Sequence, residues 1–364
     1  MQTYPIPMAP GPVHVPPEVM AAGQVDYGAA DLETEFLDLY NRTEGRLQAI
    51  MATRNRVVIH TGEGMIALWG ALKSCLKPGD RVLSIATGVF GDGIGEMARS
   101  IGAEVRKAPL PYDETVADLG PIETAINEFK PKMITAVHCE TPSGTLNPID
   151  GIGELKRRHS VPLLYVDAVS SVGGAPVLTD EWGIDLCLGG SQKCLSSTPG
   201  MAFLSVSDAA WEDVETVGYV GYDALKPFQT AQQDFYFPYT PNWQGVAMLD
   251  AGAGRILDEG LDACFDRHRS VAGNCRSRLA EMGLSLFPVP GAVSSPTVTA
   301  VKLPEGVPWP DLDAALRKEG MVVGGSYGPM AGKVFRIGHM GSQADPDLVF
   351  RAMDVLERAL ERLR

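Results

Sequence analysis

The feature that most constrains the fold is a regular alternation of short apolar runs and helix-like segments between about residues 57 and 206. The apolar runs are rich in β-branched residues and read RVVIH, RVLSIA, EVRKAPL, KMITAVHCE, LLYVDAV, LCLGGS and MAFLSV. Between several of them lie GMIALWGALKSCL, GIGEMARSIG and IETAINEFK, in which apolar residues recur at helical spacing. Strands joined through helices in this way form right-handed crossovers and a mostly parallel sheet. The sequence therefore predicts an α/β domain.

The pattern changes beyond residue 206. The stretch QTAQQDFYFPYTPN has no clear period, and we expect it to form an ordered loop. A long helical stretch begins at Trp243 and breaks near Gly260. After it come the strand-like SSPTVTAVKLP, MVVGGS and VFRIGH, a helix over Pro310 to Lys318, and a final helix from about Asp345. Strands mixed with helices in this way indicate a second, smaller α+β domain.

A chain of 364 residues is long enough for two domains. We expect an N-terminal arm over residues 1–15, a large domain over residues 16–250 and a small domain over residues 251–364. The opening MQTYPIPMAPGPVHVPPEV is proline-rich and lacks the apolar core of a signal peptide, and no window reaches a membrane-spanning length. The six cysteines form no CxxC pair, so a zinc ribbon or a thioredoxin-like motif is not supported. Several of them lie inside apolar runs, which favours buried, reduced thiols. The cytoplasm is the expected compartment.

The net charge of -14 limits the classes of partner. The chain has no block of lysine or arginine, and an acidic surface repels both phosphate backbones and anionic lipid. We therefore expect no binding to nucleic acid or to a membrane surface. A small anionic substrate remains compatible with this charge, provided that a local arginine overrides the global field.

Two charged residues follow apolar runs in surroundings of small side chains. Asp167 closes LLYVD, and Lys193 follows LCLGGSQ. Because ligands of open α/β sheets bind outside the carboxyl ends of the strands, both side chains would face one crevice if these strands lie near each other. A structural ion pair is the simplest interpretation, but the glycine and serine around Lys193 leave room beside it. An amine that forms a Schiff base and a carboxylate that keeps a ring nitrogen protonated suit an aldehyde cofactor.

A phosphate cradle for such a cofactor is offered by HTGEGMIALWGAL. The apolar run RVVIH leads into Thr61–Gly64, where a helix begins. Glycines let backbone N–H groups approach an anion at the positive end of a helix. The stretch matches neither GxGxxG nor GxxxxGK[ST], so nicotinamide and nucleoside-triphosphate cofactors lose their main support.

Further polar and aromatic residues follow predicted strands. Phe90 in TGVFGDG is placed to stack on a flat cofactor, with a core phenylalanine as the alternative. Thr141 and Ser143 in HCETPSGTLNPID face the same edge, or they stabilise a turn through hydroxyl-to-backbone bonds. The histidines beside strands share no metal-ligand spacing, so we expect them to be structural and predict no metal site: they are His60, His138 and His339.

Arg336 in VFRIGHMG alternates with apolar neighbours in a predicted strand of the small domain. An inward-facing arginine needs a carboxylate partner, from the protein or from a substrate. We favour a substrate, because the planar guanidinium grips a carboxylate at two points.

Taken together, these motifs resemble the class V aminotransferases, which are pyridoxal-phosphate enzymes of the aspartate-aminotransferase fold. The resemblance rests on TGEGMIALWGAL, TGVFGDG, HCETPSGTLNPID, VDAVSSVGG, GGSQKCLSSTPG and RIGHMG, and the opening PMAPGPVHVPPEV is similar to the family's amino-terminal GPGPV segment. It covers nearly the whole chain in one order. The resemblance implies a large domain with a mostly parallel seven-stranded sheet and a small C-terminal α+β domain.

The resemblance also implies a role for each matching residue around the ring of pyridoxal phosphate. Lys193 would carry the Schiff base and shuttle the α-proton, and Asp167 would pair with the pyridinium nitrogen. Phe90 would stack on the ring and Val169 would pack on its opposite face. Thr141 would lie near the ring hydroxyl.

At the other end of the cofactor, the resemblance implies that four residues surround the phosphate: Gly62, Glu63, Gly64 and Gln192. Thr240 in YTP resembles a threonine that relatives lend to the phosphate site of the neighbouring subunit. A homodimer with shared active sites is implied in the same way. Arg336 matches the arginine that binds the substrate carboxylate.

The nearest patterns within the class are the alanine/serine–glyoxylate and the pyridoxamine–pyruvate aminotransferases. The main hypothesis is amino transfer between a small amino acid and a 2-oxo acid, either glyoxylate or pyruvate. Glu63, where the glyoxylate enzymes usually have a small residue, leans toward the pyridoxamine enzyme, in which the vitamer is a substrate. One departure tells against that alternative, because the pyridoxamine enzyme has a second arginine at the position that aligns with Tyr327.

Two other functions remain as alternatives. A cysteine desulfurase needs a nucleophilic cysteine on a mobile loop. Relatives of that kind have a histidine directly before the Schiff-base lysine, whereas in this chain Gln192 precedes Lys193. A binding protein without catalysis is disfavoured because the chain has both Asp167 and Lys193.

Overall fold

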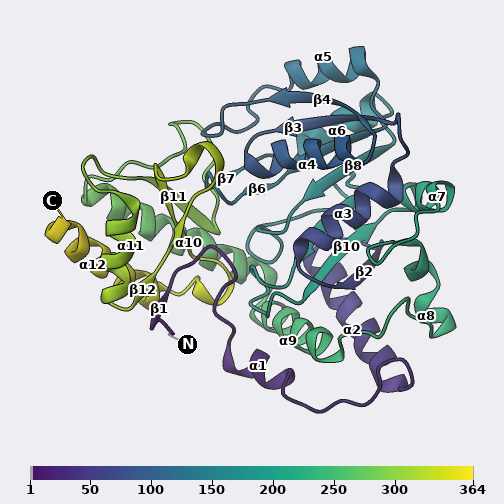
Figure 1. Cartoon of the computed structure of the whole chain (residues 1–364), viewed down its shortest axis with the longest axis horizontal. Coiled ribbons are helices and arrows are strands. Elements are labelled where there is room, and N and C mark those ends of the chain that lie inside the picture. Colours follow the sequence, from purple (N-terminus) through teal and green to yellow (C-terminus); the bar gives the residue numbers. More distant parts are fainter. Residues whose placement is uncertain (1–2, 364) are drawn as a thin grey trace.

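The computed structural model describes residues 3–363, and a seven-stranded sheet forms the centre of its larger body (Figure 1). The strand order is β2-β10-β9-β8-β5-β3-β4. Strand β10 is antiparallel to β2 and β9, and the other neighbouring pairs are parallel, which confirms the predicted mostly parallel sheet. The strands are β2 (Arg56–Thr61), β3 (Arg81–Ala86), β4 (Glu104–Pro109), β5 (Met133–Val137), β8 (Leu163–Asp167), β9 (Leu186–Gly190) and β10 (Met201–Val206).

Helices cover this sheet and supply the crossovers between its parallel strands. Strands β5, β8, β9 and β10 are buried along their whole length, which explains why their sequences are continuous apolar runs rather than alternating ones. The helices of the large body are α2 (Thr34–Ile50), α3 (Gly64–Cys75), α4 (Val89–Ser100), α5 (Gly120–Phe129), α6 (Asp150–Arg158), α7 (Asp208–Val217) and α9 (Trp243–Glu259). A short hairpin of β6 (Cys139–Glu140) and β7 (Thr145–Leu146) follows β5.

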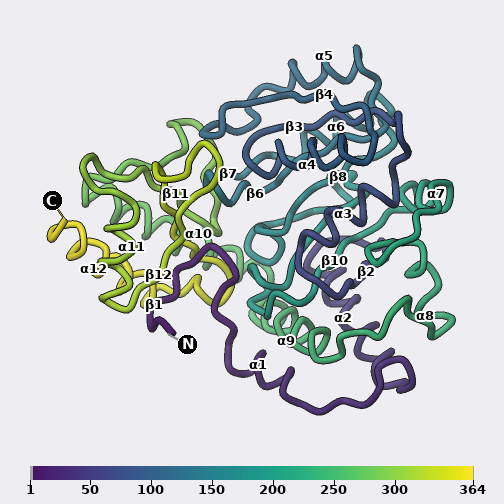
Figure 2. The backbone as a smooth tube through the Cα atoms, viewed as in Figure 1, coloured from purple at the N-terminus to yellow at the C-terminus, as the bar shows by residue number. Residues whose placement is uncertain are grey.

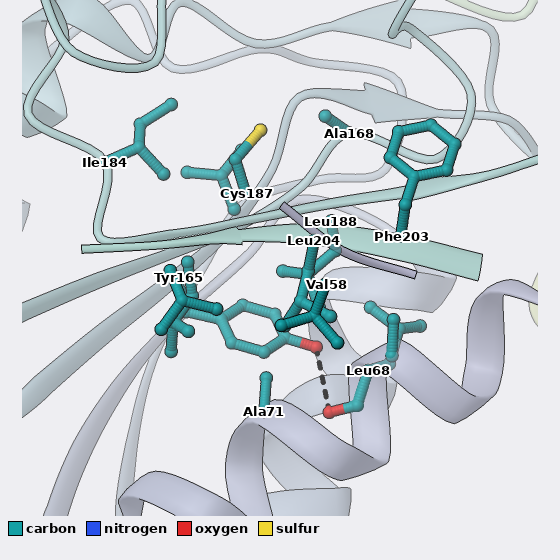
Figure 3. Close-up of a cluster of buried hydrophobic side chains, with 14 of the residues drawn as sticks. Val58, Leu68, Ala71, Tyr165, Ala168, Ile184, Cys187, Leu188, Phe203 and Leu204 are labelled. Atoms are coloured by element: carbon teal, nitrogen blue, oxygen red, sulfur yellow. Dashed lines mark hydrogen bonds between the residues drawn. The ribbon is translucent and has the colours of Figure 1, made fainter. Parts of the chain in front are cut away.

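Part of the buried core is drawn in Figure 3. Tyr165 of β8 points toward Leu68 and Ala71 of α3, whereas Cys187 and Ile184 lie on the opposite side of the sheet. The Tyr165 hydroxyl donates a 3.3 Å hydrogen bond to the Leu68 carbonyl, which satisfies a polar group inside an otherwise apolar cluster. This packing fixes α3 against one face of the sheet.

The smaller body has its own sheet and its own hydrophobic cluster. Its three-stranded sheet, in the order β11-β14-β13, is antiparallel. A pair of short parallel strands, β1 and β12, lies beside it. The elements are β1 (Ile6–Pro7), α10 (Leu261–Glu281), β11 (Val298–Lys302), α11 (Trp309–Lys318), β12 (Met321–Val322), β13 (Gly324–Gly325), η2 (Gly328–Met330), β14 (Val334–Gly338), η3 (Gly341–Gln343) and α12 (Pro346–Leu363).

The N-terminal arm connects the two bodies, and Figure 2 traces it from the small body past the centre of the molecule to α1 (Pro17–Ala22). The Met8 carbonyl accepts a 2.8 Å hydrogen bond from Gly338 N of β14. Val13 N donates a 3.0 Å hydrogen bond to the Gln192 carbonyl, next to Lys193. Between Met8 and Val13, the arm therefore contacts both the small body and the loop that carries Lys193, which we call the lysine loop.

The segment before α9 is more regular than the predicted loop. It contains η1 (Lys226–Gln229) and α8 (Ala231–Asp234), because the aromatic side chains of this stretch pack on the large body and order the backbone between them. No helix among residues 3–363 has the length and apolar character needed to cross a membrane.

The predicted domain boundary at residue 250 falls inside α9. The buried residues of α9 up to Ile256 belong to the core of the large body. We therefore propose that the boundary lies near Gly260, where the backbone leaves helical geometry between α9 and α10.

Candidate active site

A cavity of about 190 Å³ lies at the carboxyl ends of the central strands. Its walls come from the N-terminal arm, from the first turns of α3 and α4, and from the loops that follow β5, β8 and β9. This is the edge of the sheet at which the sequence places its charged residues. The lining residues are Gly11, Pro12, Glu63, Gly64, Met65, Leu68, Phe90, Cys139, Thr141, Asp167, Val169, Ser170, Gln192 and Lys193.

Asp167 and Lys193 line the same cavity but do not bind each other. Lys193 Nζ donates a 2.8 Å hydrogen bond to the Pro10 carbonyl. Asp167 Oδ1 accepts a 2.9 Å hydrogen bond from Val169 N. Among the residues that the structure describes, no ion pair joins the two side chains, so the simple ion-pair interpretation is wrong.

Burial moves both groups toward their neutral forms. It raises the pKa of Asp167 to about 6, although the Val169 N–H group and the charge of Lys193 act in the opposite direction. Burial also lowers the pKa of Lys193, and the positive charge of Arg336 adds to this effect. An amine with a lowered pKa is a better nucleophile toward a carbonyl carbon at neutral pH.

The cradle at the start of α3 holds a carboxylate as well as backbone donors. Glu63 is the N-cap of α3, and its Oε2 accepts a 3.2 Å hydrogen bond from Gln192 Nε2. Gln192 Oε1 is buried without a partner in the described part of the chain. A Cβ atom at Gly64 would lie 3.2 Å from a methyl group of Val169, so a small residue is needed for this close approach.

The chemistry of these residues is compatible with the predicted vitamin B6 cofactor, because the cavity offers an acid, an amine and an unpaired amide oxygen to a polar ligand. The ring substituent that reaches the start of α3 would meet the positive end of the helix and also the Glu63 carboxylate. Gly62 has a φ of 135° and adjoins this turn, but its atoms do not line the cavity.

Glu140, which the sequence analysis did not select, positions Phe90. The carboxylate of Glu140 accepts hydrogen bonds from Phe90 N at 3.2 Å and from Gly91 N at 2.7 Å, at the start of α4. A Cβ atom at Gly88 would lie only 2.4 Å from the Glu140 carboxyl carbon. Burial raises the pKa of Glu140 to about 7. The sequence signal was a lone acidic residue at the end of the apolar run KMITAVHCE.

The two hydroxyl residues of the ETPSG turn have different surroundings. Thr141 Oγ1 lies 2.6 Å from Ser170 Oγ, and both residues line the cavity. Ser143 Oγ donates a 3.4 Å hydrogen bond to the Glu140 carbonyl and lies 2.9 Å from Thr145 Oγ1, and Ser143 does not line the cavity. The alternative of a hydroxyl-stabilised turn therefore describes Ser143 but not Thr141.

Arg336 lies on β14 beside the cavity rather than in its wall. Its Nε donates a 2.7 Å hydrogen bond to the Gly325 carbonyl. It forms no salt bridge with any acidic side chain of residues 3–363, although it is only 3% exposed. The described residues thus provide no carboxylate partner for Arg336, and its favoured role in binding a substrate carboxylate stays a prediction.

Thr240 is exposed and lies outside the cavity of its own chain. Its neighbour Tyr239 lies close to the cradle, where the Tyr239 hydroxyl accepts a 3.2 Å hydrogen bond from Thr61 N. That Thr240 serves the site of a second subunit stays a prediction.

The histidines and cysteines lack the surroundings of metal ligands or nucleophiles. His138 Nδ1 lies 2.9 Å from Ser171 Oγ, and His339 Nε2 lies 2.8 Å from Thr299 Oγ1. All six cysteines are free and buried. Cys139 reaches the cavity, but burial raises its pKa to about 11, which keeps it protonated at neutral pH.

The N-terminal arm supplies residues that the sequence analysis did not name individually. Gly11 has a φ of 103°, and a Cβ atom on it would lie 2.5 Å from Lys193 Nζ. The carbonyl of Pro10 is the acceptor for that amine. The GPGPV-like opening was the only signal in the sequence for these contacts.

Comparison with known proteins gives a consistent result. The family model described as "Aminotransferase class-V" matches residues 13–335. The chain is 33% identical to the pyridoxamine–pyruvate transaminase of Mesorhizobium japonicum, over 98% of this chain and 91% of that protein. It is also 33% identical to the alanine–glyoxylate aminotransferase of Oryctolagus cuniculus, over 97% of this chain and 92% of that protein.

Solved structures are similar over almost the full length. The pyridoxamine–pyruvate aminotransferase of Mesorhizobium loti superposes with a TM-score of 0.94 at 32% identity, covering 100% of this chain and 93% of that one. The alanine–glyoxylate aminotransferase of Nostoc sp. superposes with a TM-score of 0.93 at 30% identity, covering 99% and 96%. The seven-stranded sheet and the small C-terminal sheet match the fold of these structures.

Proposed function

The chain belongs to the class V aminotransferase family, and on that premise we propose that it transfers an amino group between a small amino acid and a 2-oxo acid. Glyoxylate and pyruvate are the proposed acceptors, and alanine or serine the proposed donors. The observation that carries this proposal is that Asp167 and Lys193 line one cavity while each is bound to backbone rather than to the other.

Pyridoxal phosphate, which the family uses, supplies an aldehyde for the amino group and a ring that accepts electrons from the substrate Cα. We propose that Lys193 Nζ binds the aldehyde carbon and then moves the proton at the substrate Cα. Asp167 would hold the proton on the ring nitrogen, with Val169 N fixing its carboxylate. Phe90 and Val169 would orient the ring from opposite faces, and Arg336 would bind the substrate carboxylate.

A donor–acceptor screen tests this function. Alanine, serine, pyridoxamine and aminoethylphosphonate would be paired with glyoxylate and pyruvate, with and without added pyridoxal phosphate. We expect turnover with at least one amino-acid donor and an absorbance band from the lysine-bound cofactor. A purified protein that shows neither turnover nor that band after addition of pyridoxal phosphate would contradict the proposal and favour a binding protein.

A second candidate is amino transfer from pyridoxamine to pyruvate, with the vitamer as a substrate. The hydrogen bond between Gln192 Nε2 and Glu63 Oε2 favours it, because a carboxylate in the cradle repels a phosphate and accepts a hydrogen bond from a hydroxyl group. The same screen separates the two candidates. Turnover of pyridoxamine with pyruvate and no requirement for added pyridoxal phosphate would support the vitamer as the substrate.

We also propose a homodimer whose two copies complete each other's sites. Val220 is 89% exposed and Tyr236 is 74% exposed, and both lie in the segment that leads to Thr240. Large apolar side chains with this degree of exposure are candidates for an interface with a second copy. Mixing Lys193→Ala with Thr240→Ala would restore one intact site per hybrid dimer, and no recovery of activity on mixing would contradict shared sites.

A further inference from the structure

Tyr327 covers the guanidinium group of Arg336. The Arg336 Cζ atom lies 4.4 Å from the centroid of the Tyr327 ring, which is within the range of a cation–π interaction. Arg336 is 3% exposed, whereas Tyr327 is 50% exposed. The ring therefore screens the guanidinium from solvent while part of the ring itself reaches the surface.

The strand register explains this contact. Gly324 of β13 pairs with Arg336 of β14, so the chain passes over the arginine immediately after β13. A Cβ atom at Gly324 would lie 3.3 Å from Arg336 Nη2, which shows how closely the backbone approaches the guanidinium. The Gly325 carbonyl then accepts the hydrogen bond from Arg336 Nε. One edge of the guanidinium is fixed by the backbone, and one face is fixed by Tyr327.

The loop that carries Tyr327 also touches the large body. Ser326 Oγ donates a 3.1 Å hydrogen bond to the Pro142 carbonyl. A Cβ atom at Gly328 would lie 3.6 Å from Val89 at the start of α4. Pro142 and Val89 each adjoin a residue that lines the cavity, namely Thr141 and Phe90. The segment around Tyr327 therefore contacts both bodies, next to Arg336, the residue proposed to bind the substrate carboxylate.

We propose that Tyr327 is a specificity-determining residue that restricts this site to substrates with one carboxylate. This inference rests on the proposed amino transfer and extends it to the substrate class. The ring of Tyr327 orients Arg336 for a two-point grip on one carboxylate. The ring is uncharged and lies over one face of Arg336, so a second acidic group that enters beside Arg336 would meet the ring rather than a cation.

The test uses the full-length protein and four variants at one position. Tyr327→Ala and Tyr327→Leu remove the aromatic ring, Tyr327→Phe retains it, and Tyr327→Arg introduces a second cation. KM and kcat are measured for alanine with glyoxylate and with pyruvate. Calorimetric titration measures binding of propionate and succinate, which carry one and two carboxylates and cannot undergo amino transfer.

We expect Tyr327→Ala and Tyr327→Leu to raise KM for the carboxylate substrates roughly fivefold to thirtyfold, with a much smaller change in kcat. Tyr327→Phe should restore most of that loss, because the ring face that contacts Arg336 is retained. Tyr327→Arg should bind succinate at least tenfold more tightly relative to propionate than the wild type does. Phe350→Ala, which removes a ring that is 60% exposed on α12, serves as the control for loss of a surface aromatic residue.

The outcomes separate this inference from the proposed function. A wild-type protein that fails the whole donor–acceptor screen contradicts amino transfer itself. A wild-type protein that is active, together with Tyr327→Ala and Tyr327→Leu variants of unchanged KM and unchanged propionate affinity, overturns the role of Tyr327. A Tyr327→Arg variant with no gain for succinate overturns the restriction to one carboxylate.

Discussion

Lys193 Nζ donates a 2.8 Å hydrogen bond to the carbonyl of Pro10, although 183 positions separate the two residues in the sequence. The same arm is bound to the small body through Met8 and to the lysine loop through Val13. The amine therefore takes its position from a segment that contacts both bodies. We therefore expect a substitution in the arm to change the position of the Lys193 amine.

Gly11→Ala is a substitution in the arm that should displace Lys193 directly. The new Cβ would lie 2.5 Å from Lys193 Nζ at a φ of 103°, so the lysine must leave its position. We expect kcat to fall by roughly two orders of magnitude, since misplacement of a reacting group by about 1 Å has this effect. The measurement is steady-state kinetics together with the absorbance of the lysine-bound cofactor.

Gly291→Ala is the matched control for backbone strain. Gly291 has a φ of 99°, and a Cβ on it would meet no atom within 4 Å. Both substitutions therefore carry a similar conformational cost, and only that at Gly11 obstructs the lysine. Equal losses of activity in the two variants would attribute the effect to stability rather than to the position of Lys193.

Lys193→Ala should bind substrates but show almost no turnover. General-base assistance contributes roughly 10²–10⁴-fold, so the loss should reach at least that range. Stopped-flow absorbance checks substrate binding, and product analysis checks turnover. Turnover within tenfold of the wild type would remove Lys193 from the proposed mechanism.

The strands and the two central charges were predictable because their signals are local. Continuous apolar runs mark strands that are buried on both faces, and Asp167 and Lys193 stand where two such runs end. Topology alone then brings them to one edge of the sheet. The helix at the start of the cradle was predictable for the same reason, from its apolar spacing after Gly64.

The contacts that hold the site together were not predictable in this way. The hydrogen bond from Lys193 to Pro10 and the stacking of Tyr327 on Arg336 depend on how an irregular arm and a loop cross the site. In neither segment do apolar residues recur at helical or alternating spacing, so the sequence predicts no regular element there. Glu140 was missed because a buried carboxylate that binds a helix start looks in the sequence like any acidic residue after a strand. Such contacts follow from tertiary packing.

Glu63→Gln should make the cradle more favourable for a phosphate. Removing the negative charge while keeping an oxygen near Gln192 eliminates like-charge repulsion, and we expect affinity for pyridoxal phosphate to rise roughly tenfold or more. Affinity for pyridoxal, which has no phosphate, should change much less. Absorbance titration with the two vitamers measures both constants.

Glu63→Asp is the control that keeps the charge. It should resemble the wild type in its preference between the two vitamers, because the helix start still carries a carboxylate. If Glu63→Gln and Glu63→Asp shift that preference equally, the charge of Glu63 does not select the ligand of the cradle.

Asp167→Asn should stabilise the fold above pH 6 and abolish catalysis. Burial raises the pKa of Asp167 to about 6 from its ordinary value of 3.8, so the folded chain holds a proton that the unfolded chain releases between these two pH values. The unfolded state then binds fewer protons, and the contribution of Asp167 to the free energy of unfolding falls as pH rises from about 4 to 6. Above pH 6 the wild type bears a constant penalty of roughly 1–3 kcal/mol, at 1.36 kcal/mol for each unit of pKa.

Urea unfolding of the wild type and of Asp167→Asn without added vitamin B6, at pH 4 and at pH 8, measures this difference in the free energy of unfolding. Glu140, whose pKa burial raises to about 7, also feels the charge of Asp167, so its pKa falls in Asp167→Asn and the loss of this repulsion further stabilises the variant at high pH. A stability difference between the two proteins that is independent of pH would show that the Asp167 carboxyl is not held toward its protonated form, and the neutral character assigned to this end of the cavity would be wrong.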